Sequence, residues 1–143
     1  MSNAGEIMHR GAECIGPNDT LDIAARKMRD LQIGALPICG PDGGLLGIIT
    51  DRDIVVKCLA EGGDARQVRA GRLGQGEPVW VEAGASEDEV LQRMEEHKIR
   101  RLPVMENRRL VGIISEADLA IHLSEHKVAE FVERICSAAP TSV

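Results

Sequence analysis

Gly47-Ile48-Ile49-Thr50-Asp51-Arg52-Asp53-Ile54 is the stretch that decides the fold, because its pattern returns 65 positions later as Gly112-Ile113-Ile114-Ser115-Glu116-Ala117-Asp118-Leu119. A second stretch, Ile33-Gly34-Ala35-Leu36-Pro37-Ile38, returns 66 positions later as Ile99-Arg100-Arg101-Leu102-Pro103-Val104. The spacing slips by one residue in the polar loop after each proline, and such loops tolerate deletions. The chain therefore predicts two copies of one folding unit.

Composition narrows the function classes. The chain has 143 residues, a formal net charge of -6, one Trp, one Phe and no Tyr. An acidic protein without aromatic stacking surfaces is a poor partner for nucleic acid, and its charge disfavours an acidic membrane. No apolar run is long enough to span a bilayer and no signal peptide is recognised. We therefore expect a cytoplasmic protein, with secretion as the alternative. Residues 1–4 resemble a cloning remnant, and we expect no fold role for them.

Each copy reads as strand, helix, strand, strand, helix, which predicts an α/β arrangement. In the first copy a strand begins at Cys14-Ile15, and Thr20 begins the helix. In the second copy the strand is 79–81, and Ser86 with Glu89 predicts a capping box. The boundaries that follow are 5–60 for repeat 1, 61–70 for a linker, 71–126 for repeat 2, and 127–143 for a C-terminal helix and tail. That last helix either closes the core or joins a second subunit.

A polar pair in repeat 1, Thr50 and Asp53, returns in repeat 2 as Ser115 and Asp118. A hydroxyl residue with an acid three positions later is typical of a helix N-terminus, where it satisfies free backbone donors. The same groups also suit a phosphate and the hydroxyls of a ribose. A glycine three residues before each pair leaves room for a close approach. Both interpretations stay open on these residues alone.

The doubled Leu-Pro and Gly-apolar-apolar-Thr/Ser-x-x-Asp segments resemble a tandem pair of cystathionine-β-synthase (CBS) domains, a Bateman module, over residues 5–126. The resemblance implies an α/β fold of two β-α-β-β-α repeats related by a pseudo-twofold axis, here with a C-terminal helix. It implies a homodimer, clefts between the repeats for AMP, ADP or ATP, and a regulatory role toward an unidentified protein partner. The chain contains no motif for nucleophilic catalysis or a phosphate-binding loop, so we expect no enzyme.

The resemblance also assigns ligand contacts by position. Thr50 would contact phosphate and Asp53 ribose in one cleft, and Ser115 and Asp118 would do so in the other. Backbone or side chains near the first strands and the Leu-Pro segments would flank the base, and Arg52 would add a positive charge. The full predicted set is Ile15, Gly16, Leu36, Thr50, Arg52, Asp53, Val81, Leu102, Ser115 and Asp118.

Cysteines and histidines give a different hypothesis. The four cysteines lack the spacing of a zinc ribbon. In the resembled fold, Cys14 and Cys39 lie on neighbouring strands, so they are either a disulfide or reduced core thiols. His97 and His122 are either surface histidines or a zinc clip, which a dimer interface would complete. The alternative function is thus a ligand-independent dimeric interaction protein stabilised by a disulfide or zinc.

Overall fold

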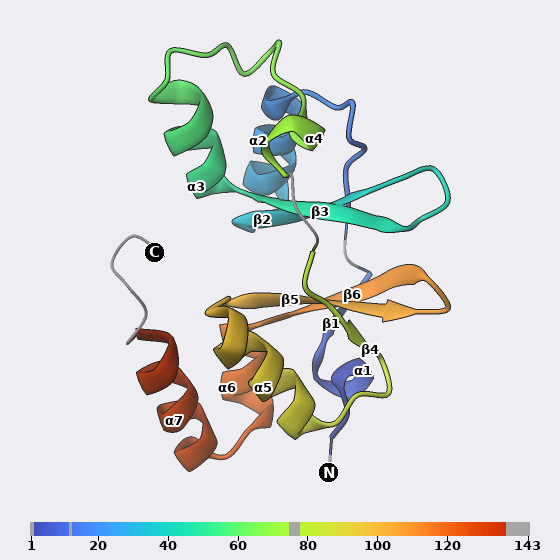
Figure 1. The fold of residues 1–143 in the computed structure, drawn as a ribbon, viewed down its shortest axis with the longest axis vertical. Coiled ribbons are helices and arrows are strands. Elements are labelled where there is room, and N and C mark those ends of the chain that lie inside the picture. The colour runs from blue at the N-terminus through green and yellow to red at the C-terminus, as the bar shows by residue number, and fades with distance from the viewer. Residues whose placement is uncertain (1, 12, 75–77, 137–143) are drawn as a thin grey trace. The chain divides into compact units, whose positions relative to one another are not determined.

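The computed structural model describes residues 2–11, 13–74 and 78–136, and the chain forms two compact units (Figure 1). Unit 1 consists of Met1–Ala12 and Val79–Val143, and unit 2 consists of Glu13–Pro78. Both units mix helices with strands, so the predicted fold class is confirmed. No helix in the described part of the chain is long and apolar enough to cross a membrane.

Unit 2 is a two-stranded antiparallel sheet covered by helices. Its elements are α2 (Leu21–Leu31), β2 (Ala35–Cys39), β3 (Leu45–Thr50), α3 (Asp51–Ile54), the π-helix η1 (Val55–Leu59) and α4 (Ala70–Leu73). The strand predicted at Cys14-Ile15 is reduced to one parallel bridge between Ile15 and Ile38. Apolar residues at helical spacing on α2 bury Leu21, Ala24 and Met28 against the sheet.

Unit 1 contains the larger sheet, in the strand order β1-β6-β5-β4. Its elements are α1 (Ala4–Ile7), β1 (His9–Arg10), β4 (Val81–Glu82), α5 (Glu87–His97), β5 (Arg101–Glu106), β6 (Arg109–Ser115), α6 (Glu116–His122) and α7 (Glu125–Cys136). The Ser86 hydroxyl accepts from the Glu89 N–H at 3.1 Å. Ser86 therefore caps α5, but the reciprocal bond predicted for a capping box is not formed.

The C-terminal helix α7 closes the core of unit 1. Phe131 on this helix is 2% exposed and belongs to that core. Two ion pairs fix the helix against α5: Lys127 Nζ lies 2.7 Å from a Glu87 oxygen, and Arg134 Nη1 lies 2.6 Å from a Glu95 oxygen. The sequence left open whether this helix closes the core or joins a second subunit. In the structure its apolar face closes the core.

The N-terminal segment takes part in the fold, so the prediction of no fold role for residues 1–4 is wrong. The Asn3 side chain caps α1 by accepting from the Glu6 N–H at 3.0 Å. Ala4 is 0% exposed, and its N–H donates to the Ala85 carbonyl at 2.8 Å. An asparagine is among the preferred residues immediately before a helix, and this one is used in that way.

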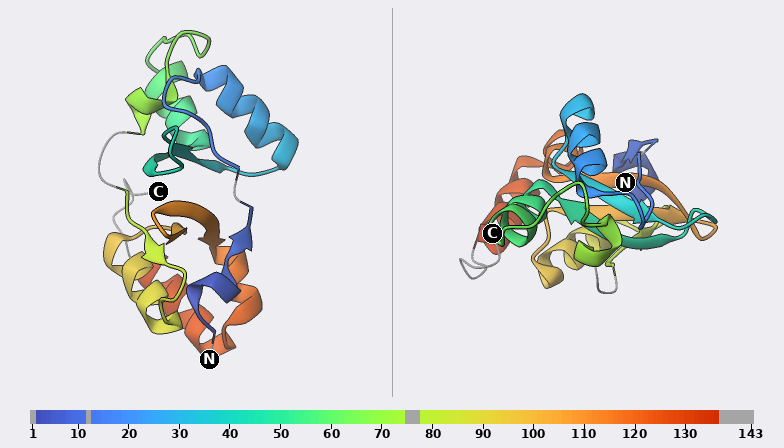
Figure 2. Two further views of the ribbon diagram at one scale, coloured as in Figure 1. Left: turned by 90° about the vertical axis from the view of Figure 1, so that its right-hand side faces the viewer. Right: turned by 90° about the horizontal axis from the view of Figure 1, so that it is seen from above.

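The first segment of each repeat lies in the unit formed by the rest of the other repeat. In unit 1, β1 pairs antiparallel with β6, with His9 opposite Ile113 (Figures 1 and 2). A Cβ atom on Gly112 would lie only 2.7 Å from the His9 carbonyl oxygen. In unit 2, a Cβ atom on Gly47 would overlap the Gly74 carbonyl oxygen. The two equivalent glycines therefore make room for the chain's own backbone.

Candidate functional site

The polar pair of unit 2 forms a complete capping box at the start of α3. Asp53 N–H donates to the Thr50 hydroxyl oxygen at 3.1 Å, and Thr50 N–H donates to Asp53 Oδ2 at 3.0 Å. The other carboxylate oxygen, Oδ1, lies 3.2 Å from Lys57 Nζ. Both oxygens of Asp53 are thus engaged within unit 2, and the capping interpretation is confirmed here.

The equivalent pair of unit 1 caps α6 but leaves one oxygen uncommitted. Asp118 Oδ2 accepts from the Ser115 N–H at 2.9 Å and from the Ser115 hydroxyl at 3.0 Å. His122 occupies the position that corresponds to Lys57, so unit 1 lacks the lysine partner of the carboxylate. The capping interpretation is confirmed in this unit as well. The Asp118 carboxylate could therefore accept a hydrogen bond from a ligand hydroxyl through Oδ1. The Asp53 carboxylate already has a partner at each oxygen.

Basic side chains differ around the two pairs. Arg52 is exposed, and its guanidinium contacts no acid in the described part of the chain. Arg100 lies 3.0 Å from a Glu116 oxygen and is therefore partly neutralised. A phosphate near the first pair would meet an unpaired Arg52, whereas Arg100 in unit 1 already has a partner.

The predicted base-flanking backbone of unit 2 is occupied by bonds within the unit. Ile15 N–H donates to the Pro37 carbonyl at 3.0 Å, and the Ile15 carbonyl accepts from Cys39 N–H at 2.9 Å. Gly16 N–H donates to Asp19 Oδ2 at 2.9 Å. These bonds fix the first segment of unit 2 on β2 and engage the Ile15 N–H, the Ile15 carbonyl and the Gly16 N–H within the unit.

The four apolar residues of the predicted set lie in the two cores. Ile15 and Leu36 belong to the core of unit 2, and Val81 and Leu102 belong to the core of unit 1. All four are buried, as expected for aliphatic residues that belong to a core. Their role toward a ligand stays a prediction.

Cys14 and Cys39 lie side by side. Both thiols are free, Cys39 is 6% exposed, and its thiol interacts with that of Cys14. Burial, with the Cys14 contact as the second cause, raises the pKa of the Cys39 thiol to about 12. At neutral pH Cys39 is therefore a protonated thiol, and an oxidant would have to react first at the half-buried Cys14.

His97 and His122 are exposed at the last residues of α5 and α6 in unit 1. His97 takes the place of Leu31 in the repeat, and Leu31 is itself 44% exposed, so a polar ring is tolerated there. No cluster of three or more His, Cys, Asp or Glu side chains suited to a metal occurs within residues 2–11, 13–74 and 78–136. The two imidazoles supply at most half of a tetrahedral zinc site.

Two residues near the candidate site were missed from the sequence. Lys57 pairs with Asp53, and this contact has a readable signal because oppositely charged residues four apart meet on a helix. Asp19 holds Gly16, and an acid in a turn before a helix commonly bonds the nearby backbone. Both residues stabilise the site without being part of the repeated motif.

The chain belongs to the CBS domain family, whose model matches residues 4–59 and 71–125. Over 137 residues the chain is 51% identical to hypoxic response protein 1 of Mycobacterium tuberculosis (strain ATCC 25618 / H37Rv), covering 96% of each. It is 33% identical to the CBS domain-containing protein YhcV of Bacillus subtilis (strain 168), covering 90% of this chain and 91% of YhcV.

Solved structures show the same fold. The crystal structure of Hypoxic Response Protein I with two coordinated zinc ions is 50% identical, with a TM-score of 0.80, and the match covers 86% of this chain and 100% of that one. The structure of CBSX2 in complex with AMP has a TM-score of 0.72 over 85% of this chain and 95% of that one. At 20% identity the likeness to CBSX2 is one of fold alone.

Proposed function

We propose that this chain is a non-enzymatic regulatory protein that binds an adenosine nucleotide through its two Thr/Ser-x-x-Asp pairs. The observation that carries the proposal is the uncommitted Oδ1 of Asp118, which faces no partner among the described residues while Oδ2 holds the cap. A carboxylate so held is pre-oriented to accept from a ribose hydroxyl. In unit 2, Arg52 is available for phosphate.

Asparagine substitutions test the nucleotide proposal without removing the caps. Asp118→Asn and Asp53→Asn each keep an oxygen for the cap but lose the charge, and Arg52→Gln loses the phosphate partner. By calorimetry we expect wild-type protein to bind AMP, ADP or ATP saturably. At least one asparagine variant should bind about tenfold more weakly, because a hydrogen bond to a charged group is worth about 1.5–3 kcal/mol.

The matched control is Asp51→Asn, which makes the same charge change at an exposed neighbour outside the box. The affinity of this variant for the adenosine nucleotide should equal that of the wild-type protein. If no adenosine nucleotide produces heat at about 5 mM, well above ordinary affinities, the two pairs serve only as helix caps.

A homodimer is part of the same proposal. The π-helix η1 of unit 2 carries three exposed apolar side chains, Val55, Val56 and Leu59. An apolar strip on one helical element is a feature of protein–protein contact surfaces. This surface would serve either a second copy of the chain or the regulated protein partner.

The alternative proposal is a ligand-independent interaction protein held by a disulfide between Cys14 and Cys39. The interaction between the two thiols supports it, since Cys14 and Cys39 flank the bridge between Ile15 and Ile38 and their side chains influence one another. The bridge would close a loop of about 25 residues, which stabilises a fold by about 3.5 kcal/mol in the chain-entropy account.

Unfolding in urea tests the disulfide proposal. We expect oxidation to raise the free energy of unfolding by about 3.5 kcal/mol at neutral pH. The reduced protein should lose stability as the pH rises from 9.0, the ordinary value for a thiol, toward about 12, because unfolding then releases the Cys39 proton. Cys39→Ala should remove both effects, whereas Cys136→Ala, at an exposed thiol, should remove neither. Equal stability of oxidised and reduced protein would exclude this role.

Zinc is the second stabiliser in the alternative proposal. His97 and His122 would supply two ligands, and a second copy of the chain or water would supply the others. The zinc-containing structure of the 50% identical Hypoxic Response Protein I supports the choice of metal. Metal analysis of purified protein should detect bound zinc that His97→Ala or His122→Ala abolishes. His126→Ala, at an exposed histidine next to Glu130, should leave it in place. Wild-type protein free of zinc would refute the site.

A further inference from the structure

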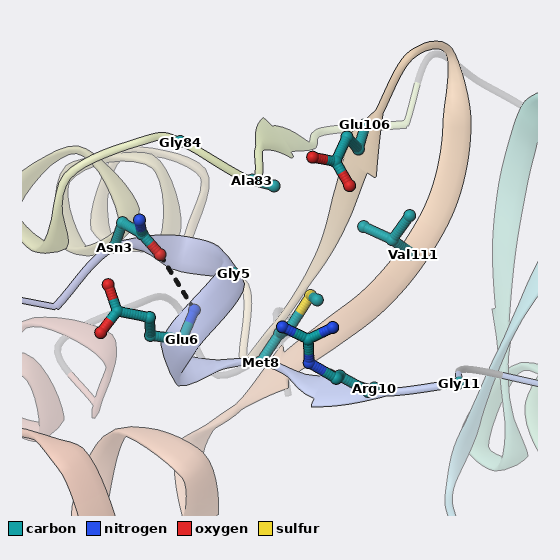
Figure 3. A pocket seen from close by; sticks show the side chains of 10 residues that line it. All are labelled: Asn3, Gly5, Glu6, Met8, Arg10, Gly11, Ala83, Gly84, Glu106 and Val111. Carbon is teal, nitrogen blue, oxygen red and sulfur yellow. Dashed lines mark hydrogen bonds between the residues drawn. The ribbon is translucent and has the colours of Figure 1, made fainter.

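A hollow of about 520 Å³ lies over one end of the sheet of unit 1 (Figure 3). It is lined by α1 and β1, by the loop between β4 and α5, and by the hairpin of β5 and β6. Gly5 N–H donates to the Ala83 carbonyl at 2.8 Å and ties the N-terminal segment to that loop. The volume lies in the range of about 300–1,000 Å³ that is usual for small-molecule sites.

Opposite charges stand on two walls of this hollow. The Arg10 guanidinium on β1 and the Glu106 carboxylate at the end of β5 point into it, whereas the Glu6 carboxylate points away (Figure 3). Neither Arg10 nor Glu106 has an ion pair with another side chain in the described ranges. Apolar atoms of Met8 and Val111 lie on the same lining. The hollow thus offers one unpaired cation, one unpaired anion and an apolar surface.

The fold does not require these charges. In the repeat of 66 positions, Arg10 corresponds to Gly76 and Glu106 corresponds to Gly40. The other copy of the folding unit is therefore built with no side chain at either position. Arg10 and Glu106 are also exposed and belong to neither core. Packing of the core therefore does not determine which side chains stand at these two positions.

We propose that this hollow binds a small zwitterion with an aliphatic side chain, the chemistry of a free neutral amino acid. The planar guanidinium of Arg10 suits a carboxylate, which it binds with two parallel hydrogen bonds. Glu106 accepts from the ammonium group, and Met8 and Val111 contact the aliphatic part. A ligand with a single charge would leave one wall charge partly desolvated and unpaired, which is unfavourable.

This site is separate from the polar pairs described above. Val111 lies near the first residue of β6, whereas Ser115 is its last residue. The proposal therefore does not rest on nucleotide binding, and either can fail without the other.

Nuclear magnetic resonance of the full chain, labelled with ¹⁵N, tests the site directly. The amides of Gly5, Gly11 and Gly84 line the hollow, and glycine amides occupy a sparse region of the spectrum. We expect L-leucine and L-valine to shift these signals saturably, and the signals of Gly43 and Gly62 in unit 2 to stay fixed. 4-Methylpentanoate, which lacks the ammonium group, and isopentylamine, which lacks the carboxylate, should each bind about tenfold more weakly than leucine.

Two variants, each lacking one of the two charges of the hollow, should lose the preference for leucine over one of the single-charge compounds. Arg10→Gln should weaken leucine binding about tenfold and no longer distinguish leucine from isopentylamine. Glu106→Gln should weaken it similarly and no longer distinguish leucine from 4-methylpentanoate. Arg101→Gln and Glu96→Gln, at exposed positions outside the hollow, are the matched controls and should bind as wild type does.

The proposal is overturned if leucine and valine leave all three glycine signals unchanged at about 20 mM, which would saturate even a millimolar site. It is also overturned if leucine and the two single-charge compounds bind equally. Because Arg10 and Glu106 are exposed and unpaired, both variants are expected to fold. Superimposable spectra away from the hollow will show that they do.

Discussion

Replacing Gly112 with alanine is expected to lower the free energy of unfolding of unit 1 by about 3 kcal/mol, a large effect for one methyl group. The added Cβ would overlap the Met8 sulfur and lie 2.7 Å from the His9 carbonyl oxygen. The backbone of β1 cannot yield without breaking its ladder with β6. Trp80 is the only tryptophan of the chain and lies in unit 1, so its fluorescence in urea measures the loss.

Gly84→Ala is the matched control for this substitution. A Cβ at Gly84 meets no atom within 4 Å, so its stability should stay within about 0.5 kcal/mol of wild type. Gly47→Ala should reproduce the large effect in unit 2, where the added atom overlaps the Gly74 carbonyl. A Gly112→Ala protein as stable as wild type would show that β1 does not pack on β6 as described.

These glycines illustrate what the sequence can and cannot predict about the fold. The order of strands and helices and both capping pairs were predictable because each depends on residues only a few positions apart, such as Thr50 and Asp53. The exchange of first segments was not predictable, because β1 has the same local pattern whichever unit it joins. A glycine indicates a close approach but not the approaching group. The space beside Gly112, interpreted as room for a ligand, is filled by β1.

In the candidate site, too, features that depend on residues close in sequence were predictable, and contacts between distant segments were not. The positions of Thr50 and Ser115 followed from the repeat, and their hydrogen bonds followed from their spacing. The hydrogen bonds between the Ile15 backbone and β2 could not be predicted from the sequence. A single bridge between distant segments leaves no periodic pattern. The hollow beside Arg10 was missed for a related reason. Three segments far apart in the chain line it, and no motif joins them.

Replacing Phe131 with alanine is expected to lower the free energy of unfolding by about 4 kcal/mol, within the range for buried aromatic side chains. Phe131 is 2% exposed and belongs to the core of unit 1, so removing its ring would leave a cavity there. Val132 follows it on α7 and is 46% exposed, which makes Val132→Ala a control that should change stability by less than about 1 kcal/mol. Urea unfolding followed by Trp80 fluorescence measures both variants. Equal small losses would mean that α7 leaves the core of unit 1 in solution, and that its apolar face is available to a second subunit instead.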